Sequence, residues 1–300
     1  PDVTDGIKVF CEVRISNNKG ITIKGGPGVG VVTKPGLAIP VGESAINPVP
    51  RKMITREVLP YIPADKGLEV IVSVPEGKKL AKKTWNPRLG IINGISIIGT
   101  TGIVEPKSIV AYQTSISLCL DVALASEHNK VVFITPGYVG ERALREKLGV
   151  PEEAIVKVGD YIGYTLDQCV KKKVQRVLLI GHIGKLAKVA AGLFNTHSKF
   201  GDARLETVAA YAAASGANSI VVKDILKLKS AEASIEILRK KNLMKTFPMI
   251  ARRIIERSRE YTKSKLEIAC ILLSLKGEIL ASEPKKLIRK EKWKKFISLA

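Results

Sequence analysis

The stretch from residue 91 to residue 194 constrains the fold most, because strand-like and helix-like runs alternate in it four times. The runs pair as residues 91–98 with 107–126, 130–135 with 139–148, 154–158 with 161–173, and 176–180 with 183–194. Two of the strand-like runs contain VVFIT and VLLIG, and such continuous apolar runs are typical of strands covered on both faces. Four successive β–α pairs predict a mostly parallel, Rossmann-like α/β sheet with helices on both faces.

The chain before this stretch follows other patterns. Residues 8–15 and 21–24 alternate polar and apolar side chains around an Asn-Asn-Lys-Gly turn, which predicts a β-hairpin. Residues 25–51, called here the Gly/Pro loop, hold six glycines and five prolines, which forbid a regular helix. We therefore expect two domains: a β-rich α+β domain over residues 1–88 and an α/β domain over residues 89–300.

The second domain should extend beyond its sheet. Helix-forming residues dominate for about sixty positions after Asp202, which predicts a helical extension. Residues 268–275 and 278–281 should form a hairpin, and residues 284–300 a basic closing helix. Leu287, Trp293, Phe296 and Ile297 of that helix could form an apolar stripe that packs a homo-oligomer.

The charge of the chain is strongly basic. Lys and Arg number 49 against 28 Asp and Glu, and residues 221–300 alone hold 21 basic and nine acidic residues. A basic surface attracts polyanions such as nucleic acid, acidic lipid or a small polycarboxylate. A nucleic-acid-binding protein without enzymatic activity is therefore one alternative. An aromatic content of 5%, not interleaved with the basic runs, disfavours it because stacking platforms are missing.

The sequence shows neither a secretory leader nor an apolar run of the roughly 18 residues that a membrane span needs. The four cysteines lie far apart, without the spacing of a disulfide framework or a zinc site. Reduced thiols in a cytoplasmic protein are the simplest explanation.

Each predicted β–α junction carries glycine or a small polar residue. Glycine lets the backbone approach a ligand closely, and ligands of open α/β sheets bind at the carboxyl ends of the strands. Convergence of the junctions would make a pocket for a nucleotide-like ligand; alternatively, the glycines only tighten short loops. The residues expected to bind such a ligand are Gly99, Thr100, Thr101, Gly102, Gly137, Asp160, Gly181 and Gly184.

Common phosphate, metal and hydrolase motifs fail in detail. GHIGK lacks the spacing and the Ser or Thr of a phosphate-binding P-loop, and GGPGVG is not followed by a helix as a dinucleotide fingerprint requires. His182 and His197 have no partner at ligand spacing, so no protein-bound metal is predicted. No GxSxG elbow exists.

One polar stretch remains after these motifs are set aside: NTHSKFGDAR, residues 195–204, called here the polar segment. It could contact a polar ligand at the mouth of the sheet, or it could only punctuate helices, with Asn195 and Asp202 as caps. His197 can exchange protons near neutral pH, which suits acid–base chemistry.

Several phrases closely resemble one family. GGPGVGVVTKPGLAIPVGESAINPVPR, GTTGIVEP, TPGYVGE and IGHIGKLAKVAAGLFNTHSKFGDARLE are similar to sequences of the cobalt-precorrin-5B C(1)-methyltransferase family of anaerobic cobalamin biosynthesis. The resemblance implies methyl transfer from S-adenosyl-L-methionine to carbon 1 of cobalt-precorrin-5B, which gives cobalt-precorrin-6A. Asp160 stands where the family often has Asn, which puts any side-chain role of this position in question.

The resemblance gives the residues provisional roles. The glycine-bearing junctions would hold the methyl donor, and His197, or after it His182, would be the base. A tetrapyrrole with many carboxylates suits a basic protein. The residues expected to bind it are Lys34, Arg51, Lys185, Asn195, Thr196, Ser198 and Lys199.

Overall fold

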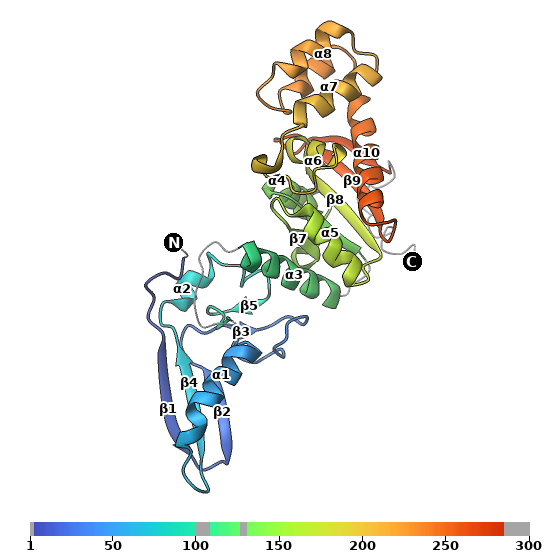
Figure 1. Ribbon diagram of the computed structural model, residues 1–300. Helices are drawn as coiled ribbons and strands as arrows, with labels where there is room; N and C mark the ends of the chain where they lie inside the picture. The colour runs from blue at the N-terminus through green and yellow to red at the C-terminus, as the bar shows by residue number, and fades with distance from the viewer. Residues whose placement is uncertain (1–2, 100–108, 127–130, 285–300) are drawn as a thin grey trace. The chain divides into compact units, whose positions relative to one another are not determined.

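A computed structural model describes residues 3–99, 109–126 and 131–284 (Figure 1). The chain forms two compact units, Pro1–Val122 (unit 1) and Ala123–Ala300 (unit 2), and each is described by itself. These units are defined by how compactly the chain packs and not by which part folds on its own, so the domain boundary expected at residue 88 stays a prediction.

Unit 1 contains a three-stranded sheet in the order β1-β4-β2, formed by β1 (Phe10–Ser16), β4 (Gly67–Ser73) and β2 (Gly20–Gly25). The hairpin predicted for residues 8–24 is wrong, because β4 lies between its two strands, antiparallel to β1 and parallel to β2. Gly67 explains how β4 fits there: a Cβ on it would lie 2.0 Å from the Asn18 carbonyl oxygen.

The core of unit 1 lies under one face of this sheet. Val70, Val72 and Val74 are buried together with Ile46 of the Gly/Pro loop. The remaining elements of the unit are β3 (Val31–Val32), α1 (Pro48–Val58), η1 (Leu59–Tyr61), α2 (Gly77–Ala81) and β5 (Ile91–Ile92), and α3 (Ile109–Ala125) follows them.

The Gly/Pro loop packs against other backbone. A Cβ on Gly28 would lie 1.7 Å from the Val74 carbonyl oxygen, and one on Gly94 would lie 2.2 Å from that of Gly28. Strand β3, which is part of this loop, pairs antiparallel with β5. Residues 91–98, expected to be the first strand of the parallel sheet, therefore belong to unit 1. That prediction is wrong because their pairing partner is a distant loop, which the local pattern does not reveal.

Unit 2 is built on a five-stranded sheet in the order β10-β9-β8-β6-β7. The strands are β6 (Val131–Thr135), β7 (Ile155–Lys157), β8 (Arg176–His182), β9 (Glu267–Leu273) and β10 (Ile279–Glu283). The first four are mutually parallel, and β10 pairs antiparallel with β9, which confirms the predicted terminal hairpin. The runs VVFIT and VLLIG are completely buried, as expected for strands covered on both faces.

The helices of unit 2 pack around this sheet. Leu144 and Leu148 pack on the face of β6 and β8 that carries Phe133 and Leu178. The predicted helical extension lies between β8 and β9. The helices of unit 2 that begin after β6 are α4 (Tyr138–Arg142), η2 (Ala143–Lys147), η3 (Glu152–Ala154), α5 (Ile162–Lys171), α6 (Ile183–Ala190), η4 (Ser198–Phe200), α7 (Arg204–Ala214), α8 (Ser219–Leu226), α9 (Ser234–Lys240) and α10 (Thr246–Tyr261).

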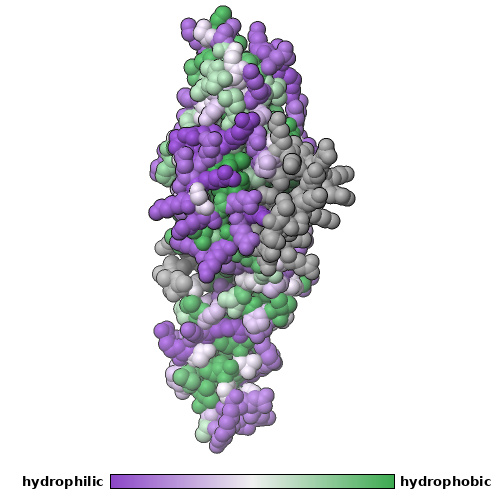
Figure 2. All heavy atoms as spheres, turned by 90° about the vertical axis from the view of Figure 1, so that its right-hand side faces the viewer, coloured by the Kyte–Doolittle hydropathy of each residue, from purple (hydrophilic) through white to green (hydrophobic). Residues whose placement is uncertain are grey.

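Helix α10 packs against β9 and α6 with one buried face, which contains Phe247, Ile250 and Ile254. Figure 2 views the side on which α10 lies and shows mostly hydrophilic side chains over this part of unit 2. No helix in the described ranges is long and apolar enough to cross a membrane. The predicted closing helix and its apolar stripe lie outside the described residues.

Candidate functional site

The candidate site lies at the carboxyl edge of the parallel strands of unit 2. Strand β6 leads into Gly137, β7 into Asp160, and β8 ends at His182. Because parallel strands end at one edge, the loops after them gather there. Lys185 shows this directly: its Nζ lies 3.0 Å from Asp160 Oδ1 and donates to the Pro136 carbonyl oxygen at 3.4 Å. Gly137, Asp160, Gly181 and Gly184 therefore share one edge.

Asp160 is the hub of this edge. Its Oδ1 accepts hydrogen bonds from Thr196 Oγ1 at 2.7 Å and from Lys185, and its carbonyl oxygen accepts one from the Thr196 amide at 3.0 Å. Partial burial raises the pKa of Asp160, but the Thr196 and Lys185 hydrogen bonds, with the charges of Lys185 and His197, lower it more. The carboxylate is therefore ionised at neutral pH.

The amino-terminal end of the polar segment is tied to the connection between β7 and α5. Asn195 forms a β-bridge with Tyr161, and Gly163 donates its amide hydrogen to the Phe194 carbonyl oxygen at 2.9 Å. A Cβ on Gly163 would lie 2.9 Å from that of Phe194, so only glycine allows the approach. The polar segment therefore contacts the loop after β7 through Tyr161 and Asp160, and its expected contact with a polar ligand stays a prediction.

His197 is exposed on this segment. Its Nδ1 accepts a hydrogen bond from the Lys199 amide at 3.1 Å, and its own amide donates to Asn195 Oδ1 at 3.1 Å. An accepting Nδ1 carries no proton, so the neutral ring is protonated at Nε2. That Nε2–H has no hydrogen-bond partner among the residues that the structure describes.

His182 has a different environment. It caps α6 by accepting the Gly184 amide at Nδ1, at 3.1 Å, and its Nε2 lies 2.9 Å from Glu232 Oε2. Glu232 also accepts the Leu275 amide at 3.1 Å. The three residues join the end of β8, the helical extension and the β9–β10 turn. Both ring nitrogens of His182 are engaged, so it is free for proton transfer only when a structural bond opens.

The other residues expected from the sequence are dispersed. Gly99 lies in unit 1, and Thr100, Thr101 and Gly102 lie outside the described residues. Ser198 and Lys199 are exposed on η4.

Lys34 and Arg51 lie in unit 1. The Lys34 side chain covers Gly90, where a Cβ would lie 2.4 Å from its Cγ. Arg51 Nε donates to the Ile46 carbonyl oxygen at 2.9 Å and Nη1 donates to that of Ile23 at 3.1 Å. Arg51 thus holds the Gly/Pro loop.

Charged and aromatic side chains flank the edge next to Gly137. Tyr138 is 66% exposed, and the Arg142 guanidinium carbon and Lys157 Nζ each lie 6.0 Å from its ring centre. Lys157 also lies 3.2 Å from Glu141, which is buried. Basic groups thus gather where the sheet opens to solvent.

Sequence reasoning missed Lys188. Its Nζ is buried under the polar segment and donates to the Thr196 and Gly201 carbonyl oxygens, each at 3.0 Å. The signal in the sequence was a lysine in IGKLAKVA, whose residues other than Lys185 and Lys188 are apolar or small. In the structure nearly every residue of this helix is buried. A lysine inside such a helix requires internal acceptors.

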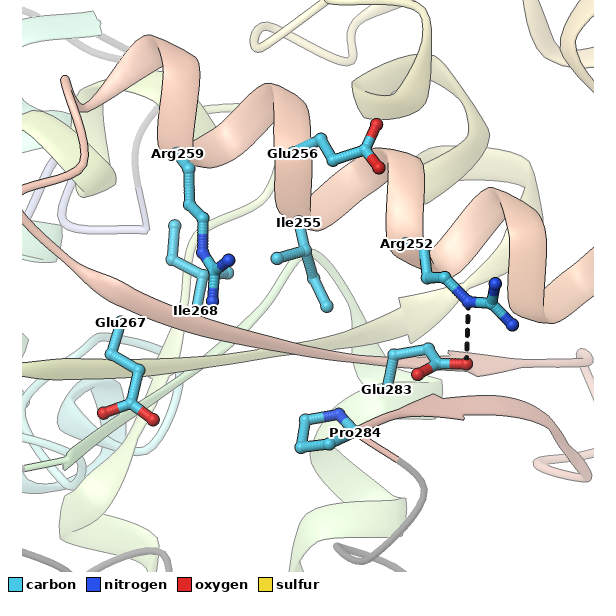
Figure 3. A pocket seen from close by; sticks show the side chains of 8 residues that line it. All are labelled: Arg252, Ile255, Glu256, Arg259, Glu267, Ile268, Glu283 and Pro284. Atoms are coloured by element: carbon cyan, nitrogen blue, oxygen red, sulfur yellow. Dashed lines mark hydrogen bonds and ion pairs between the residues drawn. The ribbon is translucent and has the colours of Figure 1, made fainter.

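A cavity of about 300 Å³ lies elsewhere, between α10, the start of β9 and the end of β10 (Figure 3). It is lined by Arg252, Ile255, Glu256, Arg259, Glu267, Ile268, Glu283 and Pro284. Because Glu267 begins β9, the cavity lies at the amino edge of the sheet, away from the loops described above. Within the described ranges, no group of three His, Cys, Asp or Glu could hold a metal ion.

Comparison with known families identifies the chain. The family model CbiD matches residues 1–106, and the model of the CbiD C-terminal domain matches residues 195–284, which begin with the polar segment. A relative from Moorella thermoacetica, named "Cobalt-precorrin-5B C(1)-methyltransferase", is 46% identical over 284 residues. The match covers 94% of this chain and 77% of the relative. The chain belongs to the CbiD family. The resemblance seen in the sequence is thereby confirmed.

A second relative supports the assignment. A relative with the same name from Desulfitobacterium hafniense is 45% identical over 295 residues, which cover 98% of this chain and 76% of the relative. A crystal structure of "cobalamin biosynthesis protein (cbiD)" from Archaeoglobus fulgidus is 27% identical. It covers 69% of this chain and 63% of that protein, with a TM-score of 0.28, so its overlay does not bear on the fold.

Proposed function

We propose that this CbiD chain transfers a methyl group from S-adenosyl-L-methionine to carbon 1 of cobalt-precorrin-5B and so produces cobalt-precorrin-6A. The observation that carries the proposal is the 46% identity, over 94% of the chain, to a relative that bears the name of this activity. Neither the family models nor the relatives named above concern nucleic acid, so the alternative of a nucleic-acid-binding protein has no support from them.

The loop edge of unit 2 fits such a methyl donor. S-adenosylmethionine, when bound, supplies an electrophilic methyl group on a sulfonium centre. A Cβ on Gly137 would meet nothing within 4 Å, so the backbone there is open to a ligand. The ionised Asp160 can accept hydrogen bonds from hydroxyl or amino groups of the donor. Gly181 and Gly184 lie at the same edge but pack against Pro136 and His182, so we expect them to shape the proposed donor site rather than to contact the ligand. The cofactor contacts expected of Gly99, Thr100, Thr101 and Gly102 stay predictions.

The substrate would be held by cations. A macrocycle with many carboxylates pairs with Lys or Arg groups that have free N–H donors. Lys185, Lys199, Arg142 and Lys157 supply such groups in unit 2, and Asn195, Thr196 and Ser198 add polar contacts. The substrate contact expected of Lys34, in unit 1, stays a prediction. Arg51 already donates to backbone oxygens, so we expect it to act by holding the Gly/Pro loop.

Methyl transfer requires the protein mainly to position the two reacting groups. Holding a carbon nucleophile in line with a methyl group in a dry pocket can contribute about 7–11 kcal/mol. Proton removal from the alkylated ring needs a base, and His197 is the first candidate because its Nε2 faces no described protein partner. In the tautomer that the Lys199 amide bond favours, Nε2 carries the ring proton. His197 can therefore accept a proton at Nε2 only in the other tautomer, in which Nδ1 holds the hydrogen and the bond from the Lys199 amide is lost.

An anaerobic assay tests the proposal. The chain is incubated with cobalt-precorrin-5B and S-adenosylmethionine that carries an isotopically labelled methyl group. We expect one labelled methyl group at carbon 1 of the product and one equivalent of S-adenosylhomocysteine. The Moorella thermoacetica relative is the positive control. Absence of label from the product, while that relative transfers it under the same conditions, would refute the proposal.

A further inference from the structure

Lys188 is a buried cation that the proposed chemistry does not use. It lies on α6 and is 3% exposed. Its Nζ donates to the main-chain carbonyl oxygens of Thr196 and Gly201, each at 3.0 Å. Among the residues that the structure describes, no carboxylate lies within ion-pair distance of it.

Such burial is costly, and the contacts that offset it show what the residue does. An ammonium group loses its hydration inside a protein, so it persists there when good acceptors replace water. The two acceptors stand five positions apart in the polar segment. By binding both, Lys188 draws the two ends of this irregular stretch onto the same helix. The charge also reaches Asp202: the Arg204 hydrogen bond is the main cause that lowers the pKa of Asp202, and Lys188 contributes.

Thr196 connects this contact to the candidate site. Its carbonyl oxygen accepts from Lys188, whereas its hydroxyl and amide donate to Asp160. Asp160 in turn pairs with Lys185. A continuous set of hydrogen bonds therefore runs from the interior of α6 through the polar segment to the carboxylate at the loop edge, and His197 follows Thr196 directly.

We propose that Lys188 is a positioning residue, which clamps residues 196 and 201 onto α6 and thereby holds Asp160 and His197 in their working geometry. The inference rests on the proposed function for its catalytic consequence. The clamp itself is a property of the fold and can be measured without any substrate.

Hydrogen exchange of the full chain measures the clamp. In Lys188→Met, which keeps the length but loses the donors, backbone amides of residues 195–201 should exchange about tenfold faster or more, since two charge-assisted bonds are lost. Lys188→Arg should restore most of the protection. Lys240→Met removes an exposed lysine of α9 and should leave these amides unchanged. Unchanged exchange in folded Lys188→Met would overturn the proposal.

Kinetics measure the consequence. With the methyl-transfer assay, Lys188→Met should lower kcat by about 100-fold, more than it raises either KM, and Lys188→Arg should recover at least part of kcat. If Lys188→Met does not fold by circular dichroism, Lys188→Gln, which keeps an N–H donor, takes its place. Faster exchange with an unaltered kcat would overturn the positioning role, whereas absence of activity in the unaltered chain would refute the proposed function and leave the clamp intact.

Discussion

The Gly/Pro loop of unit 1 and the polar segment of unit 2 are both irregular, but different contacts hold them. The Gly/Pro loop packs backbone against backbone, at distances that only Gly28 and Gly94 allow. The polar segment is held by side chains, through Lys188 and Asp160. The first arrangement tolerates no added atom and binds no proton. The second places ionisable groups at the surface, where chemistry can use them.

The largest expected effect breaks the first kind of contact. Gly28 has φ of +79°, and a Cβ on it would overlap the Val74 carbonyl oxygen. Gly28→Ala should therefore lower the free energy of unfolding by about 3 kcal/mol or more, measured by urea denaturation. Gly42→Ala is the control, because Gly42 has φ of +93° but open space around it. It should cost only about 1 kcal/mol. Equal losses would show that backbone conformation alone matters.

The next effect concerns Asp160, which binds Thr196 of the polar segment. Asp160→Ala leaves Lys185 and Thr196 without their shared acceptor and should lower kcat/KM by about 100-fold. Asp160→Asn keeps an acceptor and should cost about tenfold. Asp167→Ala removes a carboxylate of α5 that binds Tyr261 instead, and should change kcat/KM by less than about twofold. A full loss in Asp160→Asn would mean that the charge, rather than the geometry, is required.

The two histidines sharpen the comparison within unit 2. His182→Ala removes a helix cap and the bond to Glu232, and should cost about 1–2 kcal/mol of unfolding free energy. His197→Ala removes an exposed cap and should cost less than about 1 kcal/mol, yet lower kcat by about 100-fold or more. Denaturation and kinetics on both variants check this. A larger kcat loss in His182→Ala would exchange the two roles.

The smallest effect is a pH dependence of stability. The folded-state pKa of Asp160 lies below its ordinary value of 3.8, so its carboxylate stabilises the fold above that value. This contribution is lost as the pH falls from about 4 through the lower folded pKa. Urea denaturation of the native chain and of Asp160→Asn at pH 7 and pH 3 should therefore show a smaller acid loss in the variant. Identical losses would contradict the assignment.

The sequence predicted where strands form better than it predicted which strands pair with one another. VVFIT and VLLIG are long enough and apolar enough to require burial on both faces, and they form β6 and β8 as expected. Residues 8–24 and 91–98 have equally good local patterns, but β4 and the Gly/Pro loop take their pairing positions. Pairing depends on contacts between distant residues, which periodicity does not encode.

The candidate site was predictable to the same extent. Parallel strands force their carboxyl ends to one edge, so the meeting of Gly137, Asp160 and Gly181 follows from the strand order. The partners of the two histidines do not follow, because Glu232 approaches His182 from the helical extension, fifty positions away. Lys188 was missed for a similar reason: its acceptors are main-chain carbonyl oxygens of the polar segment, which has no regular secondary structure pattern that would place it over α6.

The order of the strands also bears on how the protein is synthesised. Strand β9 lies beside β8 near the middle of the sheet, yet it is made from residues 267–273, which are synthesised after α7–α10. Until then β8 has an open, apolar edge that another nascent chain could pair with. The three-stranded sheet of unit 1 has no such delay, since its last strand, β4, ends at Ser73. A chain released before residue 267 should therefore aggregate through unit 2.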